Sequence, residues 1–144
     1  APVTKTLAMF GLLALTATTP AHADEDEAES CLRAMVWDGY ADGWGIRTMT
    51  TTTLEQGKTR NYLVTFYPNK EYQIRTCGDG GVKDLDVIIY DLEGKVQKRD
   101  ETSDAKPTVT FKSDSIATFY VVVHAKENTS ADAKAGVAVA ASYR

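Results

Sequence analysis

Aspartates are the residues of this 144-residue chain whose spacing is best suited to chemistry. Asp84 and Asp86 are two residues apart, so on a strand their side chains project from the same face. Asp79 precedes them in a glycine-rich turn, and Asp91 follows them in the next turn. Calcium takes oxygens from carboxylates and backbone carbonyls, which makes these four aspartates candidate calcium ligands. Their spacing differs from that of an EF-hand loop, so ordinary hydrogen bonds and cross-strand ion pairs are the alternative interpretation.

Three aromatic residues form a second candidate site: Trp37, Tyr40 and Trp44. Exposed aromatic rings on a β-sandwich can stack on sugars, which makes these residues candidates for ligand binding. The alternative is that they pack a helix onto the rest of the protein, because burial of large aromatic side chains strongly stabilises a small domain.

The sequence singles out no catalytic site. His124 is the only histidine after residue 22, and it lies in an alternating run that predicts a strand. The Gly-x-Ser-x-Gly motif of a nucleophilic serine is absent from the sequence. Acidic residues are numerous, but nothing distinguishes a pair suited to glycoside hydrolysis. We therefore predict that the protein is not an enzyme and requires no cofactor.

Residues 1–23 predict a secretory signal peptide. Lys5 precedes an apolar run at 7–15 that is too short to span a bilayer, and the small residues of Ala21-His22-Ala23 fit a cleavage site. We predict cleavage after the last of these residues, so that the mature chain begins at Asp24. The protein is then exported, to the periplasm or outside the cell, and keeps no membrane span.

Export bears on the two cysteines, Cys31 and Cys77, because an oxidising compartment lets a disulfide persist. Only one intramolecular pairing is available to two cysteines. Two buried thiols or a bridge between chains are the alternatives. No other cysteine or histidine lies at the spacing of a zinc site.

The mature chain divides into two parts with different periodicity. In residues 24–45, apolar residues recur at steps of three and four from Ala28 to Tyr40, which predicts a helix followed by a glycine-rich connection. In residues 46–144 the period is two, and turn-forming residues separate the runs. About eight short strands of this kind predict an all-β fold, an antiparallel β-sandwich preceded by one α-helix. The clearest alternating runs are 48–53, 62–67, 71–76, 84–89, 109–111, 119–123 and 137–141.

The most specific sequence pattern is a glycine-rich turn, Gly78-Asp79-Gly80-Gly81, that leads into Asp84-Leu85-Asp86 and the turn Tyr90-Asp91-x-x-Gly94. With the flanking strands, this pattern resembles the bacterial pre-peptidase C-terminal domain over roughly residues 46–143. The resemblance implies a jelly-roll-like β-sandwich that is non-catalytic and accompanies exported enzymes. Some domains of that family are similar to collagen-binding domains that bind calcium. The flanking strand sequences are 61–64, 72–74, 109–111 and 119–123.

Charge and length limit the partners. The 16 basic and 20 acidic residues give a net charge of −4, which argues against nucleic acid as a partner. The length suits a single domain. We therefore predict an exported, non-catalytic binding or accessory module that engages a protein or a polysaccharide. The alternative is a structural or assembly subunit of an envelope or extracellular structure, and the sequence does not decide the oligomeric state.

Overall fold

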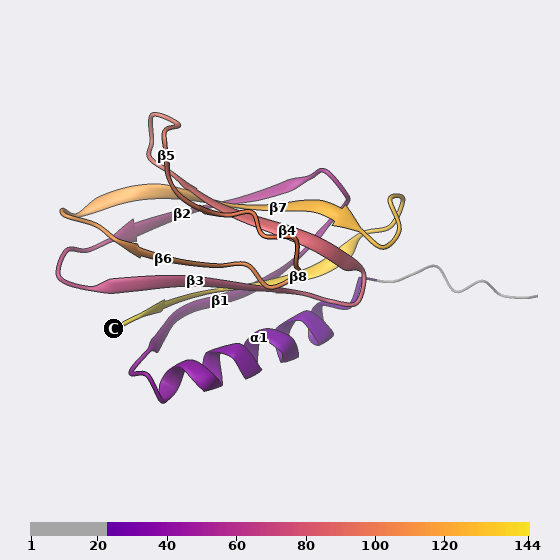
Figure 1. Cartoon of the computed structure of the whole chain (residues 1–144), viewed down its shortest axis with the longest axis horizontal. Coiled ribbons are helices and arrows are strands. Elements are labelled where there is room, and N and C mark those ends of the chain that lie inside the picture. The colour runs from indigo at the N-terminus through magenta and orange to yellow at the C-terminus, as the bar shows by residue number, and fades with distance from the viewer. Residues whose placement is uncertain (1–22) are drawn as a thin grey trace, which may run out of the picture.

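The computed structural model describes residues 23–144, so the predicted signal peptide lies outside the described residues except for Ala23. Within this part of the chain, none of the helical structure is both long and apolar enough to cross a membrane. One helix, α1 (Glu25–Tyr40), precedes eight strands (Figure 1). The strands are β1 (Gly45–Leu54), β2 (Thr59–Phe66), β3 (Glu71–Gly78), β4 (Val82–Tyr90), β5 (Val96–Asp100), β6 (Thr108–Lys112), β7 (Ala117–Asn128) and β8 (Ala135–Tyr143).

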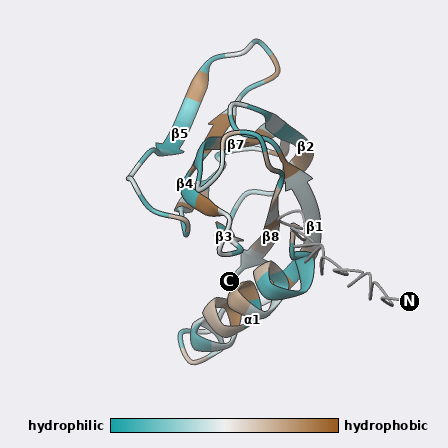
Figure 2. Ribbon diagram, turned by 90° about the vertical axis from the view of Figure 1, so that its right-hand side faces the viewer, coloured by the Kyte–Doolittle hydropathy of each residue, from teal (hydrophilic) through white to brown (hydrophobic). Residues whose placement is uncertain are grey.

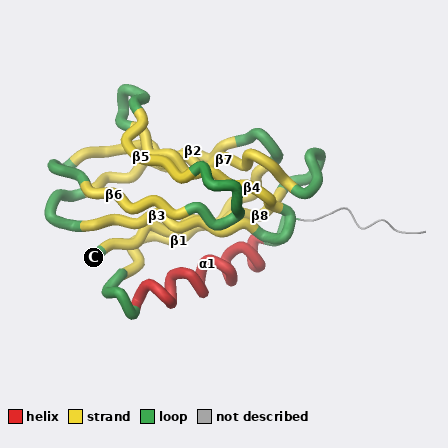
Figure 3. Tube along the Cα trace, in the orientation of Figure 1, coloured by secondary structure: helices red, strands yellow, loops and turns green. Residues whose placement is uncertain are grey.

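The strands form two four-stranded antiparallel sheets. The first sheet has the order β1-β8-β3-β6, and the second has the order β2-β7-β4-β5. Successive strands change sheet at every step except between β4 and β5, which are neighbours in the second sheet. This is the connectivity of an eight-stranded jelly roll. The two sheets face each other, and α1 lies on the outer side of the first (Figure 3). The predicted β-sandwich with one preceding helix is confirmed.

The main core lies between the two sheets and follows from the alternation of apolar residues along each strand. Leu85, Val87 and Ile89 of β4 are fully buried, as is Phe66 at the end of β2. The Phe66 ring lies 5.5 Å from that of Phe119, measured between centroids. Aromatic pairs at this separation add to the stabilisation that burial alone provides.

Strand β5 is the element that the period-two pattern did not predict. Its sequence, Val-Gln-Lys-Arg-Asp, has three exposed polar residues between two half-buried ends. It lies at the edge of the second sheet and pairs only with β4. An edge strand with solvent on both faces needs no apolar alternation, so the sequence carries no strand signal there.

Helix α1 packs on the outer face of the first sheet, below the sandwich in Figure 2. The Asp24 side chain accepts a hydrogen bond from the Glu27 amide at 2.9 Å and thereby caps the first turn. The buried face of α1 contacts Ala138 and Ala140 of β8, whose small side chains allow a close approach. Tyr40, which the sequence pattern placed on the inward stripe, is instead 51% exposed. The buried helix residues are Ala28, Leu32, Val36 and Gly39.

The end of α1 is held by an arginine from the sheet beneath it. The Arg75 guanidinium of β3 donates a hydrogen bond to the Met35 carbonyl oxygen. The same guanidinium lies so close to Gly39 that a Cβ atom there would approach it to 2.7 Å. A glycine at this position therefore lets the last turn of α1 sit directly on Arg75.

The predicted disulfide between Cys31 and Cys77 is confirmed, and it joins the middle of α1 to β3. Cys77 is fully buried beneath the helix. The two cysteines are 46 residues apart in the sequence, so the bond closes a long loop in the unfolded chain. Closing a loop of this length removes conformational entropy from the unfolded state.

We expect the double variant Cys31→Ser, Cys77→Ser to unfold with a free energy about 2–4 kcal/mol lower than that of the oxidised wild-type protein. Urea unfolding of the purified mature proteins measures this difference. Wild-type protein kept in reductant is the control, because it lacks the same constraint and should unfold like the variant. Equal stability of oxidised wild type and variant would contradict the prediction.

Candidate binding surface

The outer face of α1 near its C-terminal end carries two exposed aromatic side chains. Trp37 is 75% exposed and Tyr40 is 51% exposed. Their rings meet edge to face, with centroids 5.8 Å apart. Because large aromatic residues usually lose most of their exposure on folding, a Trp that remains three-quarters exposed marks a surface that packing does not explain.

The two aromatic residues line a hollow of about 200 Å³ between α1 and β1. Ile46 of β1 is also exposed there, and Met49 forms part of the lining. Arg33 lies four residues before Trp37, which places both on the same face of the helix. We call the set of Arg33, Trp37, Tyr40, Ile46 and Met49 the Trp37 surface.

The third predicted aromatic residue, Trp44, does not belong to this surface. It is only 6% exposed, and the Arg144 guanidinium lies 4.5 Å from its ring centroid. Trp44 thus packs where the helix connection meets the end of the sandwich, as the packing interpretation predicted. The structure therefore separates one buried aromatic residue from the two that are available to a ligand.

Asp79, a predicted calcium ligand, instead fastens the start of the helix to the sheet. Asp79 is 5% exposed, and its carboxylate accepts three backbone hydrogen bonds. One oxygen accepts from the amides of Asp24 (2.7 Å) and Gly136 (2.8 Å), and the other accepts from Gly81 (2.8 Å). Both oxygens are thus occupied by N–H donors from α1, β8 and its own turn.

Asp91, the second of the four, shapes the turn between β4 and β5. One of its oxygens accepts from the amides of Glu93 (3.0 Å) and Lys95 (2.8 Å). Gly94, in the same turn, has a φ of 86°, a conformation that side chains other than that of glycine rarely adopt. Asp91 therefore acts as a turn residue at the opposite end of β4 from Asp79.

Asp84 and Asp86 do lie together, on one face of β4, as their spacing predicted. Asp84 is 7% exposed and Asp86 is 4% exposed, and one carboxylate oxygen of each is buried without a hydrogen-bond partner. The second oxygen of Asp86 lies 3.6 Å from Nδ1 of His124 on the neighbouring strand β7. Burial, followed by the charge of Asp84, raises the pKa of Asp86 above its ordinary value.

The four predicted calcium ligands are therefore not brought to one point. In residues 23–144 no cluster of three or more carboxylate, histidine or cysteine side chains is arranged to hold a metal ion. Asp84 and Asp86 are the two of the four whose carboxylates retain an unpartnered oxygen. Calcium binding stays a prediction, and it now depends on this pair.

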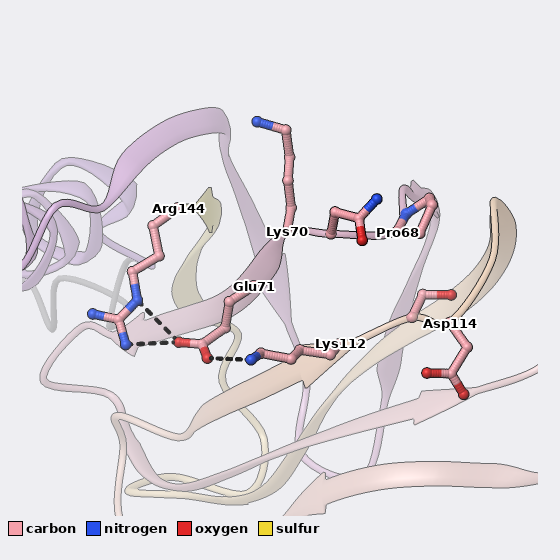
Figure 4. Close-up of a pocket in the computed structure, with 8 residues that line it drawn as sticks. Pro68, Lys70, Glu71, Lys112, Asp114 and Arg144 are labelled. Carbon is pink, nitrogen blue, oxygen red and sulfur yellow. Dashed lines mark hydrogen bonds and ion pairs between the residues drawn. The ribbon is translucent and has the colours of Figure 1, made fainter.

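A larger hollow, of about 660 Å³, lies at the end of the sandwich where the chain leaves β8. Figure 4 shows the charged side chains around it, with Arg144 and Lys112 converging on Glu71. Arg144 Nη2 lies 2.9 Å from one Glu71 oxygen, and Lys112 Nζ lies 3.6 Å from the other. The charges of Glu71 and its two partners thus join β3, β6 and the end of β8 rather than remaining free for a ligand.

A third hollow, of about 540 Å³, separates the edge strands β1 and β2. Its walls combine apolar side chains such as Val64, Val121 and Val139 with threonines, including Thr48 and Thr50. Strand β1 pairs only with β8, and β2 pairs only with β7, so each has one unpaired side in the sheets. The sandwich is therefore open along this edge.

The fold defines a class, the jelly-roll β-sandwich with a helix on one face. Neither protein-family models nor curated protein sequences match the chain. Among solved structures, the chain is similar to PliG from Aeromonas hydrophila, a periplasmic lysozyme inhibitor of g-type lysozyme. The TM-score is 0.51 at 9% sequence identity, over 69% of this chain and 89% of that chain. At this identity the likeness shows a shared fold.

We expect Asp79→Asn to lower the free energy of unfolding by about 2–3 kcal/mol, because the amide cannot accept all three N–H donors and carries no charge. Urea unfolding at about pH 7 measures the change. The exposed Asp104→Asn is the matched control, since the Asp104 carboxylate accepts one backbone hydrogen bond, from the Lys106 amide, at the surface. An Asp79→Asn protein as stable as this control would contradict the prediction.

The corresponding substitution Asp86→Asn should raise the free energy of unfolding at neutral pH, whereas Asp79→Asn lowers it. Because folding raises the pKa of Asp86, the protonated carboxyl favours the folded state below the ordinary pKa, and this contribution is lost as the pH rises through the folded-state value. At about pH 7 the charged, buried carboxylate is therefore a cost, which Asp86→Asn removes. We expect the variant to be about 1 kcal/mol more stable than wild type there and to lose this advantage near pH 4. A variant less stable than wild type at neutral pH would contradict the prediction.

Proposed function

We propose that this protein is an exported, non-catalytic module that binds another protein through the Trp37 surface. The observation that carries the proposal is the exposed pair of Trp37 and Tyr40 on a rigid helix. Trp, Tyr and Arg are the residue types that dominate binding energy at protein interfaces, and all three occur together on this surface. The disulfide supports export, because such bonds persist in oxidising compartments.

The surface is rigid, which favours binding. Helix α1 is fixed by the Cys31–Cys77 disulfide, by the Arg75 hydrogen bond to the Met35 carbonyl and by its buried face. A ligand therefore meets side chains whose backbone is already ordered, so that little conformational entropy is lost on binding.

The partner class we propose is an enzyme that degrades cell-wall glycans. PliG, which shares the fold, is a periplasmic inhibitor of g-type lysozyme, and this chain is predicted to be exported as well. Membership of the pre-peptidase C-terminal family stays a prediction. In that resemblance the glycine-rich turn and the Asp-Leu-Asp strand correspond to the β3–β4 turn and β4.

We expect the mature protein to inhibit one or more lysozymes, including the g-type, in an assay of bacterial cell-wall clearing. Trp37→Ala should raise the concentration needed for inhibition by about tenfold or more, because a central Trp contributes strongly to an interface. Its melting temperature should stay the same, since an exposed side chain adds little to stability. Leu92→Ala is the matched control, because Leu92 is 59% exposed and lies in the turn between β4 and β5.

Three results would count against parts of this proposal. A Trp37→Ala protein that inhibits as well as wild type would exclude the Trp37 surface as the binding site. Absence of inhibition across the lysozymes would exclude this class of partner. Co-sedimentation with purified peptidoglycan that depends on Trp37, without inhibition, would replace the protein ligand with a polysaccharide.

The alternative function is assembly into a larger structure through the open edge between β1 and β2. The observation that favours it is that both strands have an unpaired side along the same hollow. Unpaired strand edges accept a strand from a second chain by β-augmentation. Light scattering over a wide concentration range tests this: oligomers that grow with concentration support assembly, and a constant monomer contradicts it.

A further inference from the structure

The N-terminal end of α1 lies on a buried carboxylate. The backbone nitrogen of Asp24 donates a hydrogen bond to Oδ2 of Asp79 at 2.7 Å. We propose that Asp79 is a binding site for the α-ammonium group that the chain acquires at Asp24 when the preceding residues are removed. The proposal rests on the predicted cleavage after Ala23 and is independent of the Trp37 surface.

The backbone of Asp24 and Gly136 is packed closely around the Asp79 carboxylate. The same oxygen of Asp79 accepts from the Gly136 amide at 2.8 Å, so Asp24 and β8 share one acceptor. A Cβ atom on Gly136 would lie 2.6 Å from the Asp24 carbonyl oxygen, so glycine is required for this close approach. The position of the Asp24 nitrogen is therefore fixed by both the helix and the sheet.

Asp79 is buried without a cationic partner. It is 5% exposed, and the ion pairs in residues 23–144 do not include it. Its three partners are the neutral amides of Asp24, Gly81 and Gly136. A buried carboxylate surrounded by neutral donors gains most from a donor that carries a positive charge.

Cleavage supplies such a donor at the position already in contact. Hydrolysis of the peptide bond between Ala23 and Asp24 by a signal-peptide-removing protease consumes one water molecule. The released segment keeps the carboxylate, and the Asp24 nitrogen becomes a primary amine that takes up a proton. The hydrogen bond at 2.7 Å, which has a neutral donor before cleavage, thereby becomes an ion pair between the ammonium and the Asp79 carboxylate.

The other charged groups near the Asp24 nitrogen are mainly acidic. The Asp24 carboxylate caps the helix, and the Glu27 carboxylate accepts from the Gly80 amide at 3.1 Å beside Asp79. Glu25 lies in the first turn, where its carboxylate accepts from the Thr51 hydroxyl at 2.9 Å. Lys134, just before β8, is exposed. The helix dipole disfavours a cation at this end, and these carboxylates together with Asp79 counter it.

The consequence is a fold that is completed only after export. The disulfide requires an oxidising compartment, and the ion pair requires the removal of the signal peptide. Both interactions fasten α1 to the first sheet, one at the middle of the helix and one at its start. The precursor in the reducing cytosol lacks both, so its helix is held less firmly than that of the mature protein.

Two chains that differ by one residue test the proposal: 24–144 and 23–144, both oxidised. Both carry the same charged groups, but in the longer chain the Asp24 nitrogen is again an amide and the α-ammonium group lies one residue away, on Ala23. We expect 24–144 to melt about 5 °C higher at neutral pH, which corresponds to about a tenfold change in the folding constant. The difference should vanish when Asp79→Asn is introduced into both chains.

A second measurement keeps the test decisive where the Asp79→Asn chains do not fold. The α-amino pKa of 24–144, followed by nuclear magnetic resonance, should lie about one unit or more above its ordinary value of about 8. Because the folded-state pKa is raised, the extra stability is full below the ordinary value and is lost as the pH rises through the raised one. Equal melting of the two chains, or an ordinary α-amino pKa, would overturn the proposal. Sequencing of the exported protein should find Asp24 first, and another start would also overturn it.

Discussion

Strand β8 imposes the constraint on which the rest of the structure depends, because it is buried on both of its faces. Eight of its nine residues are buried, and only Tyr143 is exposed. On the inner face Val137 and Val139 contribute to the core between the sheets, whereas on the outer face Ala138 and Ala140 contact α1. Alternation of larger and smaller apolar residues replaces the usual alternation of apolar and polar ones. The small outer residues let the helix backbone approach the sheet, and the fixed helix then presents Trp37 to solvent.

The elements that the sequence predicts are those whose signal lies in residues close together along the chain. The strands with one buried face were visible as period-two runs, and α1 was visible from Ala28, Leu32 and Val36 at steps of four. Strand β5 was not, because both of its faces meet solvent. The exposure of Trp37 follows from its position directly after Val36. The next residue along a helix is rotated by about 100°, which takes Trp37 off the buried face.

The four aspartates show why a candidate site is harder to predict than a fold. Sequence spacing places Asp84 and Asp86 on one face of a strand, and there they lie. The role of Asp79 depends on Asp24 and Gly136, which are 55 and 57 residues away, and no local pattern reports contacts of that range. The same residue type thus holds a helix in one place and is a buried carboxyl with a raised pKa and an unpartnered oxygen in another. Which role applies is decided by the number of N–H donors within reach of each carboxylate.

Fixing a helix on the outside of a sandwich has a functional consequence that the sandwich alone would not provide. The outward side chains on the faces of a β-sandwich are mostly polar. Most of the loops of this one lie at the two ends (Figure 3). A helix added to one face can carry large aromatic residues that neither the core nor the loops need to accommodate. The conformational entropy lost when α1 is ordered on the sheet is offset by three interactions: the disulfide, the buried Asp79 carboxylate and Arg75 from β3. Each of them acts on a different part of α1. Rigid attachment suits the binding surface proposed above, because a ligand of Trp37 and Tyr40 would meet these side chains on a backbone that is already ordered.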